Sequence, residues 1–268
     1  MEFSWRDEVP PEANYGSGSV VLTAFPSAGL ATIIAGHYMV RALKLPRIGR
    51  FDSPDLAPVA VVQAGEVNPT IRVYGHKGLA LVLSEFPPSP SQANAVARTV
   101  LDDAERHQAR AIICLEGVVP HPEDDEEEGG GAEPESPVEQ VWVTYARADT
   151  EFAKGFQSAG ARQLEEGVIG GVSGALLVQG IGRSVPVAAL LVSARIAEGL
   201  PDHRAGAALI ETLDRLLPEL KIDTGPLRAQ AEQIEKALRA VMQRRPGAAG
   251  PGEAPSEPEP TAVPEMYR

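Results

Sequence analysis

A chain of 268 residues is long enough for one large domain or two small ones, and its hydrophobic content of 43% is sufficient for a real core. The net charge of −13 argues against nucleic acid or an anionic membrane as the main partner. No apolar stretch approaches the roughly 18 residues of a membrane span, and no secretory signal pattern is present. The single cysteine, Cys114, excludes an intramolecular disulfide, so we expect a cytoplasmic protein.

The first half of the chain predicts alternating strands and helices. Residues 1–17 are expected to form an irregular lead-in, and the apolar run at 20–25 predicts a strand. Ser27 is a suitable N-cap for a helix over residues 28–44. Serine followed by proline at 89–90 predicts the start of the next helix. Further strands are expected at 47–51, 59–63, 71–74 and 79–83, the last two forming a hairpin.

The second half repeats this alternation. The uninterrupted apolar run at 111–115 predicts a strand that is buried on both faces, as in parallel sheets. Asp202 is a suitable N-cap for a helix that ends before Pro218. The other expected elements are strands at 138–146 and 185–192, a short helix at 151–158, and a last helix from about residue 224.

The last helix carries apolar residues seven apart at Leu227, Ile234 and Val241. The stripe covers about two heptads, fewer than the three or four that indicate a coiled coil. Two interpretations stay open: an amphipathic helix lying on its own domain, or a helix that packs against a partner subunit.

Two segments are of low complexity. Residues 120–137 contain an acidic run, with eight Asp or Glu at 123–135, and without these eight charges the net charge would be −5. Like charges at this density repel, so we predict a disordered surface loop. Residues 244–268, rich in Pro, Gly and Ala, predict an extended linker and tail with a reach of about 25 Å. The sequence thus predicts a single α/β domain over 18–243.

The glycine-dense segment with Gly170, Gly171, Ser173 and Gly174 is the main candidate for chemistry in the core. It matches neither a P-loop nor a dinucleotide fingerprint, and Ala175 stands where a nucleophile elbow needs glycine. A catalytic serine, an anion-binding or small-ligand loop, and close backbone packing stay open as explanations. The five histidines lack the spacing of a zinc site. We therefore predict no catalytic residue, no metal site and no cofactor.

Met266, Tyr267 and Arg268 end the sequence with an apolar residue, a tyrosine and one further residue. Such a tripeptide, with its α-carboxylate, fits a pocket that captures a peptide terminus. Tyrosine accounts for 5 of 268 residues and apolar residues for 43%, so the pair occurs by chance about once in 100. The chain contains no comparably clear catalytic motif.

Six loosely defined features follow one another in a fixed order between about residues 18 and 243. They are Phe51-Asp52-Ser53-Pro54, Asn68-Pro69-Thr70-Ile71, the hairpin leading to Leu79–Glu85, Gly170 to Leu177, the buried strand ending at Val192, and Pro201-Asp202 with its helix. In their order and spacing the chain resembles the proteasome assembly chaperone family of archaea and bacteria, relatives of the second eukaryotic proteasome assembly chaperone.

The resemblance implies a three-layer α/β/α sandwich with a mostly buried mixed sheet, similar to the nucleoside phosphorylase/hydrolase fold, and no established catalytic residues. It also implies that Met266 and Tyr267 fill a pocket between neighbouring α-subunits of the proteasome core particle. The carboxylate of Arg268 would pair with a pocket lysine. The acidic loop at 123–135 departs from the family pattern.

The sequence therefore predicts a homo-oligomeric assembly chaperone, or an ATP-independent activator, that docks on the proteasome α-ring through its C-terminal tail. One alternative is a nucleoside- or phosphate-binding protein, or an enzyme, with a pocket near Gly170–Gly174. Another is an oligomeric scaffold whose acidic loop recruits a basic partner.

Overall fold

The computed structural model describes residues 3–10, 14–63, 65–76, 78–119, 139–147, 150–195 and 200–244. The chain divides into two units, residues 1–231 and 232–268, and each is considered by itself. The first unit contains the sheet and all helices except the greater part of the last one, α6 (Gly225–Arg244). The acidic segment and the C-terminal tail lie outside the described residues.

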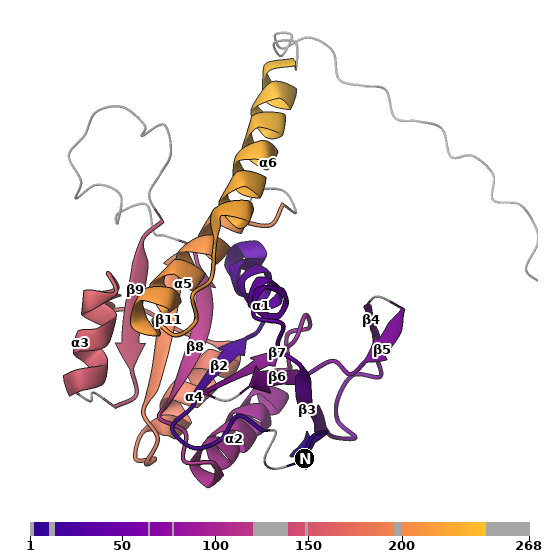
Figure 1. The fold of residues 1–268 in the computed structure, drawn as a ribbon, viewed down its shortest axis with the longest axis vertical. Helices are drawn as coiled ribbons and strands as arrows, with labels where there is room; N and C mark the ends of the chain where they lie inside the picture. Colours follow the sequence, from indigo (N-terminus) through magenta and orange to yellow (C-terminus); the bar gives the residue numbers. More distant parts are fainter. Residues whose placement is uncertain are drawn as a thin grey trace, which may run out of the picture. The chain divides into compact units, whose positions relative to one another are not determined.

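A mixed sheet of nine strands forms the middle layer (Figure 1). In spatial order its strands are β1 (Ser4–Asp7), β3 (Arg47–Asp52), β6 (Arg72–His76), β7 (Leu79–Leu83), β2 (Val20–Ala24), β8 (Ala111–Val118), β11 (Val187–Ser193), β9 (Val141–Tyr145) and β10 (Arg162–Gln163). The four central strands, β7, β2, β8 and β11, are parallel to one another. Antiparallel neighbours, β6 and β9, flank this parallel block.

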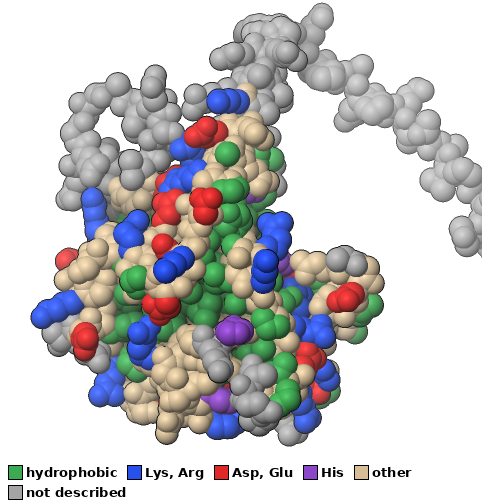
Figure 2. All heavy atoms as spheres, viewed as in Figure 1, with side chains coloured by type: hydrophobic (Ala, Val, Ile, Leu, Met, Phe, Trp, Pro, Cys, Tyr) green, Lys and Arg blue, Asp and Glu red, His purple; other side chains and the backbone are tan. Residues whose placement is uncertain are grey.

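Helices cover both faces of the sheet and give the three layers that the family resemblance implies (Figure 1). On one face lie α1 (Ala31–Ala42), α3 (Thr150–Ser158) and α5 (His203–Leu216), with the first turns of α6. On the other face lie α2 (Pro90–Arg106) and α4 (Gly171–Gly180). Figure 2 shows hydrophobic side chains gathered along the middle of the α1 and α5 face, with charged side chains around them.

The sequences of the central strands are nearly continuous apolar runs because helices cover both of their faces. In β8, Ile112 and Cys114 belong to the core under α2 and α4, whereas Ile113 and Leu115 belong to the core under α1 and α5. Because a strand between two helical layers has both faces against the core, most of its side chains are apolar. The prediction of a fully buried parallel strand at 111–115 is confirmed.

Two helix starts form as their sequences predict. At α2 the Ser89 hydroxyl accepts from the backbone N–H of Gln92, whose side chain accepts from the N–H of Ser89. At α5 the Asp202 carboxylate accepts from the N–H groups of Arg204 and Ala205, at 3.1 Å each.

Three sequence predictions are wrong in detail. The lead-in contains strand β1, which pairs with β3 at the edge of the sheet. The helix predicted from residue 28 begins as a short 3₁₀ helix, Ala28–Leu30, and continues as α1 after Leu30 adopts a φ of +52°. Ser27 makes no capping hydrogen bond to this helix; its hydroxyl accepts from the N–H of Gly117 in β8 instead. The strand expected at 59–63 is β4 (Val61–Gln63), and it forms a small hairpin with β5 (Glu66–Asn68), which the sequence analysis did not predict.

The heptad stripe of the last helix begins within its own domain. Leu227 and Ala231 are buried in the core under α1 and α5. Arg228 between them donates to the carboxylates of Glu211 and Glu139 at 2.8–3.0 Å. For these first turns the amphipathic interpretation is confirmed; the side chains at 238 and 241 lie outside the description. Within the described residues, no helix is both long enough and apolar enough to cross a membrane.

Candidate functional site

The glycine-dense segment forms the start of α4. Gly170 is the N-cap residue, and Gly171 adopts a φ of +61°. At Gly174 a Cβ atom would lie 2.2 Å from the carbonyl oxygen of Ile169, so a larger residue cannot fit without a backbone shift. At Gly170 and Gly171 a Cβ atom would meet nothing within 4 Å. Close packing therefore explains Gly174, whereas the backbone before it faces open space.

Ser173, in the first turn of α4, is 3% exposed, and its hydroxyl interacts with the carboxyl group of Glu116 on β8. Burial raises the pKa of Glu116 to about 7, although the hydrogen bond from Ser173 lowers it. Sequence reasoning missed Glu116, because the predicted strand ended at Leu115. The sequence did contain a signal for it, because Glu116 is a charged residue that directly follows the apolar run at 111–115.

The pair of Ser173 and Glu116 does not form a catalytic triad with a described histidine. His37 contacts Glu85 at 2.8 Å, and the Nδ1 atom of His203 lies 3.1 Å from the carbonyl oxygen of Pro201. His107 contacts the hydroxyl of Tyr15 and the carbonyl of Asp103. Each of these three histidines is engaged with other partners, so none of them supplies a base at Ser173.

A hollow of about 290 Å³ borders α4 on its outer side, and Gly174 is part of its wall. Its apolar lining includes Leu177, Val178 and Ile181, of which Val178 and Ile181 are each 68% exposed. Two carboxylates, Glu165 and Glu166, also line it, and none of the described lysines or arginines does. This composition disfavours a phosphate ligand, because the anion would meet two further anions.

In open α/β sheets, ligands bind at the carboxyl ends of the strands, where neighbouring connections leave in opposite directions. Here the corresponding place, between β2 and β8, is filled by the chain itself. A Cβ atom at Gly117 would lie 2.4 Å from the carbonyl oxygen of Ala28, and the N–H of Gly117 donates to Ser27 at 3.0 Å. This close contact leaves no room for a nucleoside between the two loops.

The same edge of the sheet carries exposed apolar side chains instead. Each of the four parallel strands is followed by a large hydrophobic residue that is 39–57% exposed: Leu30 after β2, Phe86 after β7, Val119 after β8 and Leu200 after β11. The loops are joined to one another, since the N–H of Asp202 donates to the carbonyl of Gly29 at 2.8 Å. An edge of this kind suits contact with another protein better than catalysis on a small substrate.

Other predicted features cannot be placed. Met266, Tyr267 and Arg268 and the acidic run at 123–135 lie outside the described residues. Among the residues that the structure does describe, no group of three or more His, Cys, Asp or Glu side chains is placed to hold a metal ion. The described part of the chain thus presents a three-layer α/β protein with buried polar pairs and exposed apolar edges.

This chain belongs to the PAC2 family, whose model matches residues 21–242. It is 25% identical to an uncharacterized protein of Methanocaldococcus jannaschii over 225 residues, which cover 84% of this chain and 86% of that relative.

Solved structures share the fold. PbaA of Pyrococcus furiosus, described as an archaeal homolog of proteasome-assembly chaperone, has a TM-score of 0.71 at 24% identity, over 87% of this chain and 90% of that one. PbaB of the same organism, described as an archaeal proteasome activator, has a TM-score of 0.68 at 20% identity, over 90% and 99%. A proteasome-assembly chaperone homologue of Mycobacterium tuberculosis has a TM-score of 0.62 at 16% identity, over 84% and 96%. The expected family and the three-layer fold are therefore confirmed.

Proposed function

We propose that this protein acts on the proteasome core particle, as an assembly chaperone or an ATP-independent activator, and docks on the α-ring through Met266, Tyr267 and Arg268. The observation that carries the proposal is the match over almost the whole domain to PbaA and PbaB, which are described as a chaperone homolog and a proteasome activator. The PAC2 family assignment supports the same class of function.

The described surface supports a role in protein binding. The exposed side chains of Leu30, Phe86, Val119 and Leu200 lie at one edge of the sheet, and the place between β2 and β8 is closed by Gly117. Exposed apolar side chains gathered in one place are typical of interaction surfaces. A closed crevice is unsuited to the nucleoside chemistry of related folds.

In the proposed docking mode, Met266 and Tyr267 supply an apolar and a phenolic group to a pocket, and the carboxylate of Arg268 pairs with a lysine of the α-ring. A single tripeptide buries little area and binds weakly. A homo-oligomer that presents several tails gains on the order of 10²–10⁴ in avidity. We propose such an oligomer in the cytoplasm, without nucleic acid or membrane as a partner.

The test compares co-purification of the proteasome α-ring with the full chain and with a variant that lacks residues 266–268. We expect the truncated variant to keep its melting temperature and lose binding by at least tenfold. Tyr267→Ala should behave like the truncation, whereas the matched control Arg268→Ala should keep most of the binding, because the last position tolerates any side chain. Undiminished binding by the truncated chain would refute docking through the tail.

A second function, the binding of a small molecule near Gly170–Gly174, has one observation in its favour. Glu116, whose pKa burial raises to about 7, interacts with Ser173 near the open backbone of Gly170 and Gly171. A thermal-shift screen with nucleosides and inorganic phosphate tests this function. A stabilisation that Ser173→Ala abolishes would support it, and the absence of any shift at millimolar ligand would exclude it.

A further inference from the structure

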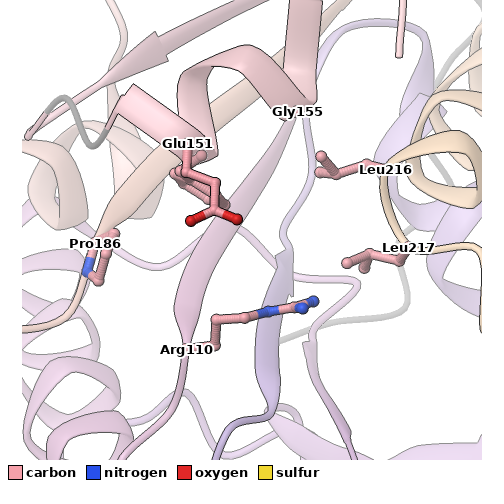
Figure 3. Close-up of a pocket in the computed structure, with 7 residues that line it drawn as sticks. Arg110, Glu151, Gly155, Pro186, Leu216 and Leu217 are labelled. Atoms are coloured by element: carbon pink, nitrogen blue, oxygen red, sulfur yellow. The ribbon is translucent and has the colours of Figure 1, made fainter. Parts of the chain in front are cut away.

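A cavity of about 360 Å³ opens at the amino end of the parallel strands (Figure 3). The exposed apolar side chains of Leu30, Phe86, Val119 and Leu200 follow the carboxyl ends of these strands, at the opposite edge of the sheet. Arg110 directly precedes β8, and Pro186 directly precedes β11. The first turns of α3 close the cavity on one side, and the end of α5 closes it on the other. This volume lies at the lower end of the roughly 300–1,000 Å³ of small-molecule sites.

The walls of the cavity are apolar and well supported. Phe152 of α3 packs edge-on against Phe156, with ring centroids 5.0 Å apart, and Phe156 is fully buried. On the other side, Leu216 is half-buried and Leu217 is buried in the core. Side chains that are packed in this way do not collapse into the space, because their positions are fixed from behind.

Gly155 brings α3 close to α5. A Cβ atom at this position would lie 3.0 Å from the Cδ1 atom of Leu216, and no other neighbour comes within 4 Å. A small side chain would thus press on Leu216, and a larger one would extend into the cavity. The absence of a side chain at Gly155 helps to keep the space open.

Two opposite charges border this apolar space. Figure 3 shows the side chains of Arg110 and Glu151 pointing into the region bounded by Leu216 and Leu217. Arg110 also contacts Glu219, but at 3.7 Å, with both side chains more than half exposed. Exposed ion pairs of this kind contribute little to stability, so the guanidinium of Arg110 can turn to a ligand at little cost.

We infer that this cavity binds a small zwitterion with an apolar body, namely an α-amino acid with a branched or aromatic side chain. Its carboxylate would pair with Arg110, its ammonium group with Glu151, and its side chain would lie against Phe152, Leu216 and Leu217. The inference concerns a different part of the chain from the proposed docking tail and does not depend on it.

The charges select this class over simpler ligands. A fatty acid would bring its carboxylate towards Glu151, and an apolar amine would bring its charge towards Arg110. A neutral hydrocarbon would remove water from both charges and replace none of their hydrogen bonds. A zwitterion offers an opposite charge to each of the two groups at once. At about 30 Å³ for each water-sized volume, the cavity has room for on the order of ten non-hydrogen atoms, the size of leucine or phenylalanine.

Calorimetric titration of the full chain with L-leucine and L-phenylalanine tests the inference. N-acetyl-leucine lacks the ammonium charge, and leucinamide lacks the carboxylate. We expect the free amino acids to bind, and each blocked derivative to bind at least tenfold more weakly, because a hydrogen bond to a charged group contributes about 1.5–3 kcal/mol. Equal binding of the free and blocked compounds, or no binding at 10 mM, would overturn the inference.

Variants locate the binding to the cavity. Arg110→Gln and Glu151→Gln should each weaken binding of leucine at least tenfold, and Gly155→Leu should abolish it by filling the space. The matched control is Arg98→Gln, which removes the same charge from an exposed position on α2, on the other face of the sheet. If Gly155→Leu fails to fold, Arg110→Gln and Glu151→Gln are sufficient to test the binding site, because both replace side chains at the rim of the cavity and leave the core intact. Unchanged binding by Arg110→Gln would also overturn the inference.

Discussion

The fully buried guanidinium of Arg72 on β6 is ion-paired with the carboxylate of Glu85, two residues beyond the end of β7. Arg72 also donates to the hydroxyl of Tyr74 at 3.0 Å and to the carbonyl oxygen of Pro69 at 2.9 Å. The same carboxylate lies 2.8 Å from the Nε2 atom of His37 on α1. One carboxylate thus joins the hairpin of β6 and β7 to the helix that covers it.

Replacing Glu85 by alanine should destabilise the protein by about 3–5 kcal/mol, because it leaves the buried guanidinium of Arg72 without its counter-charge. Urea unfolding at pH 7 measures the change. The control is Arg6→Ala, which breaks the exposed pair between Arg6 and Asp52, separated by 3.5 Å. That change should cost less than about 1 kcal/mol. If both variants lost the same free energy of unfolding, Glu85 would not be the counter-charge that the buried guanidinium of Arg72 requires.

The same pair predicts how stability depends on acid pH. Burial raises the pKa of Glu85, but hydrogen bonds from His37 and Arg72 outweigh it and lower the pKa from 4.5 to about 2. Between these values the unfolded chain binds a proton that the folded protein does not, so stability falls as the pH decreases. Urea midpoints from pH 5 to pH 2 should therefore decline less steeply for Glu85→Ala than for the natural chain. If the urea midpoints of the two proteins declined equally steeply with falling pH, the lowered pKa would not belong to Glu85.

Glu116 should have the opposite effect near neutral pH. Burial raises its pKa to about 7, so between pH 4.5 and 7 the folded protein holds a proton that the unfolded chain has released. Stability should therefore decrease as the pH rises through this window. Glu116→Gln, which can keep a hydrogen bond to Ser173, should remove this dependence and stabilise the protein at pH 8 by about 1–3 kcal/mol. Thermal unfolding at pH 5 and 8 tests this, with the exposed Glu165→Gln as the control.

The glycines at the start of α4 should differ in their tolerance of alanine. At Gly174 the new Cβ atom would meet the carbonyl oxygen of Ile169 at 2.2 Å, so the backbone must shift. We expect Gly174→Ala to cost about 1–3 kcal/mol, the usual cost of overpacking. Gly170→Ala, at a φ of −104° with open space around it, should change stability by less than about 1 kcal/mol. Urea unfolding of the two variants measures both values, and equal losses would show that packing does not explain Gly174.

Much of the secondary structure could be predicted because it depends on local chemistry. The capping box at Ser89 and Gln92, and the capping carboxylate of Asp202, form within a single turn, so the sequence around them is sufficient. The apolar runs of β8 and β11 indicated burial on both faces and hence parallel strands. The family resemblance, which rests on motifs in a fixed order, is confirmed by the match over residues 21–242.

The failures concern residues whose partners lie far away in the sequence. Ser27 looks like a helix cap, yet its hydroxyl accepts from Gly117, 90 residues later. Strand β1 forms only because β3 offers an unpaired edge, and its short polar sequence gives no sign of this. Glycine density at 170–174 was compatible with a ligand loop and with packing; only the carbonyl of Ile169 next to Gly174 distinguishes the two at that position.

The sequence by itself determined the family, the alternation of strands and helices and their buried faces, because apolar periodicity and capping act over a few residues. It also supplied Met266, Tyr267 and Arg268 as the docking hypothesis, which the described residues do not test. Only the tertiary structure decided that the crevice between β2 and β8 is closed, that the half-buried Glu116 lies against Ser173, and that Arg110 and Glu151 border one cavity. Each of these depends on contacts between distant segments, whose geometry is set by the packing of helices on the sheet.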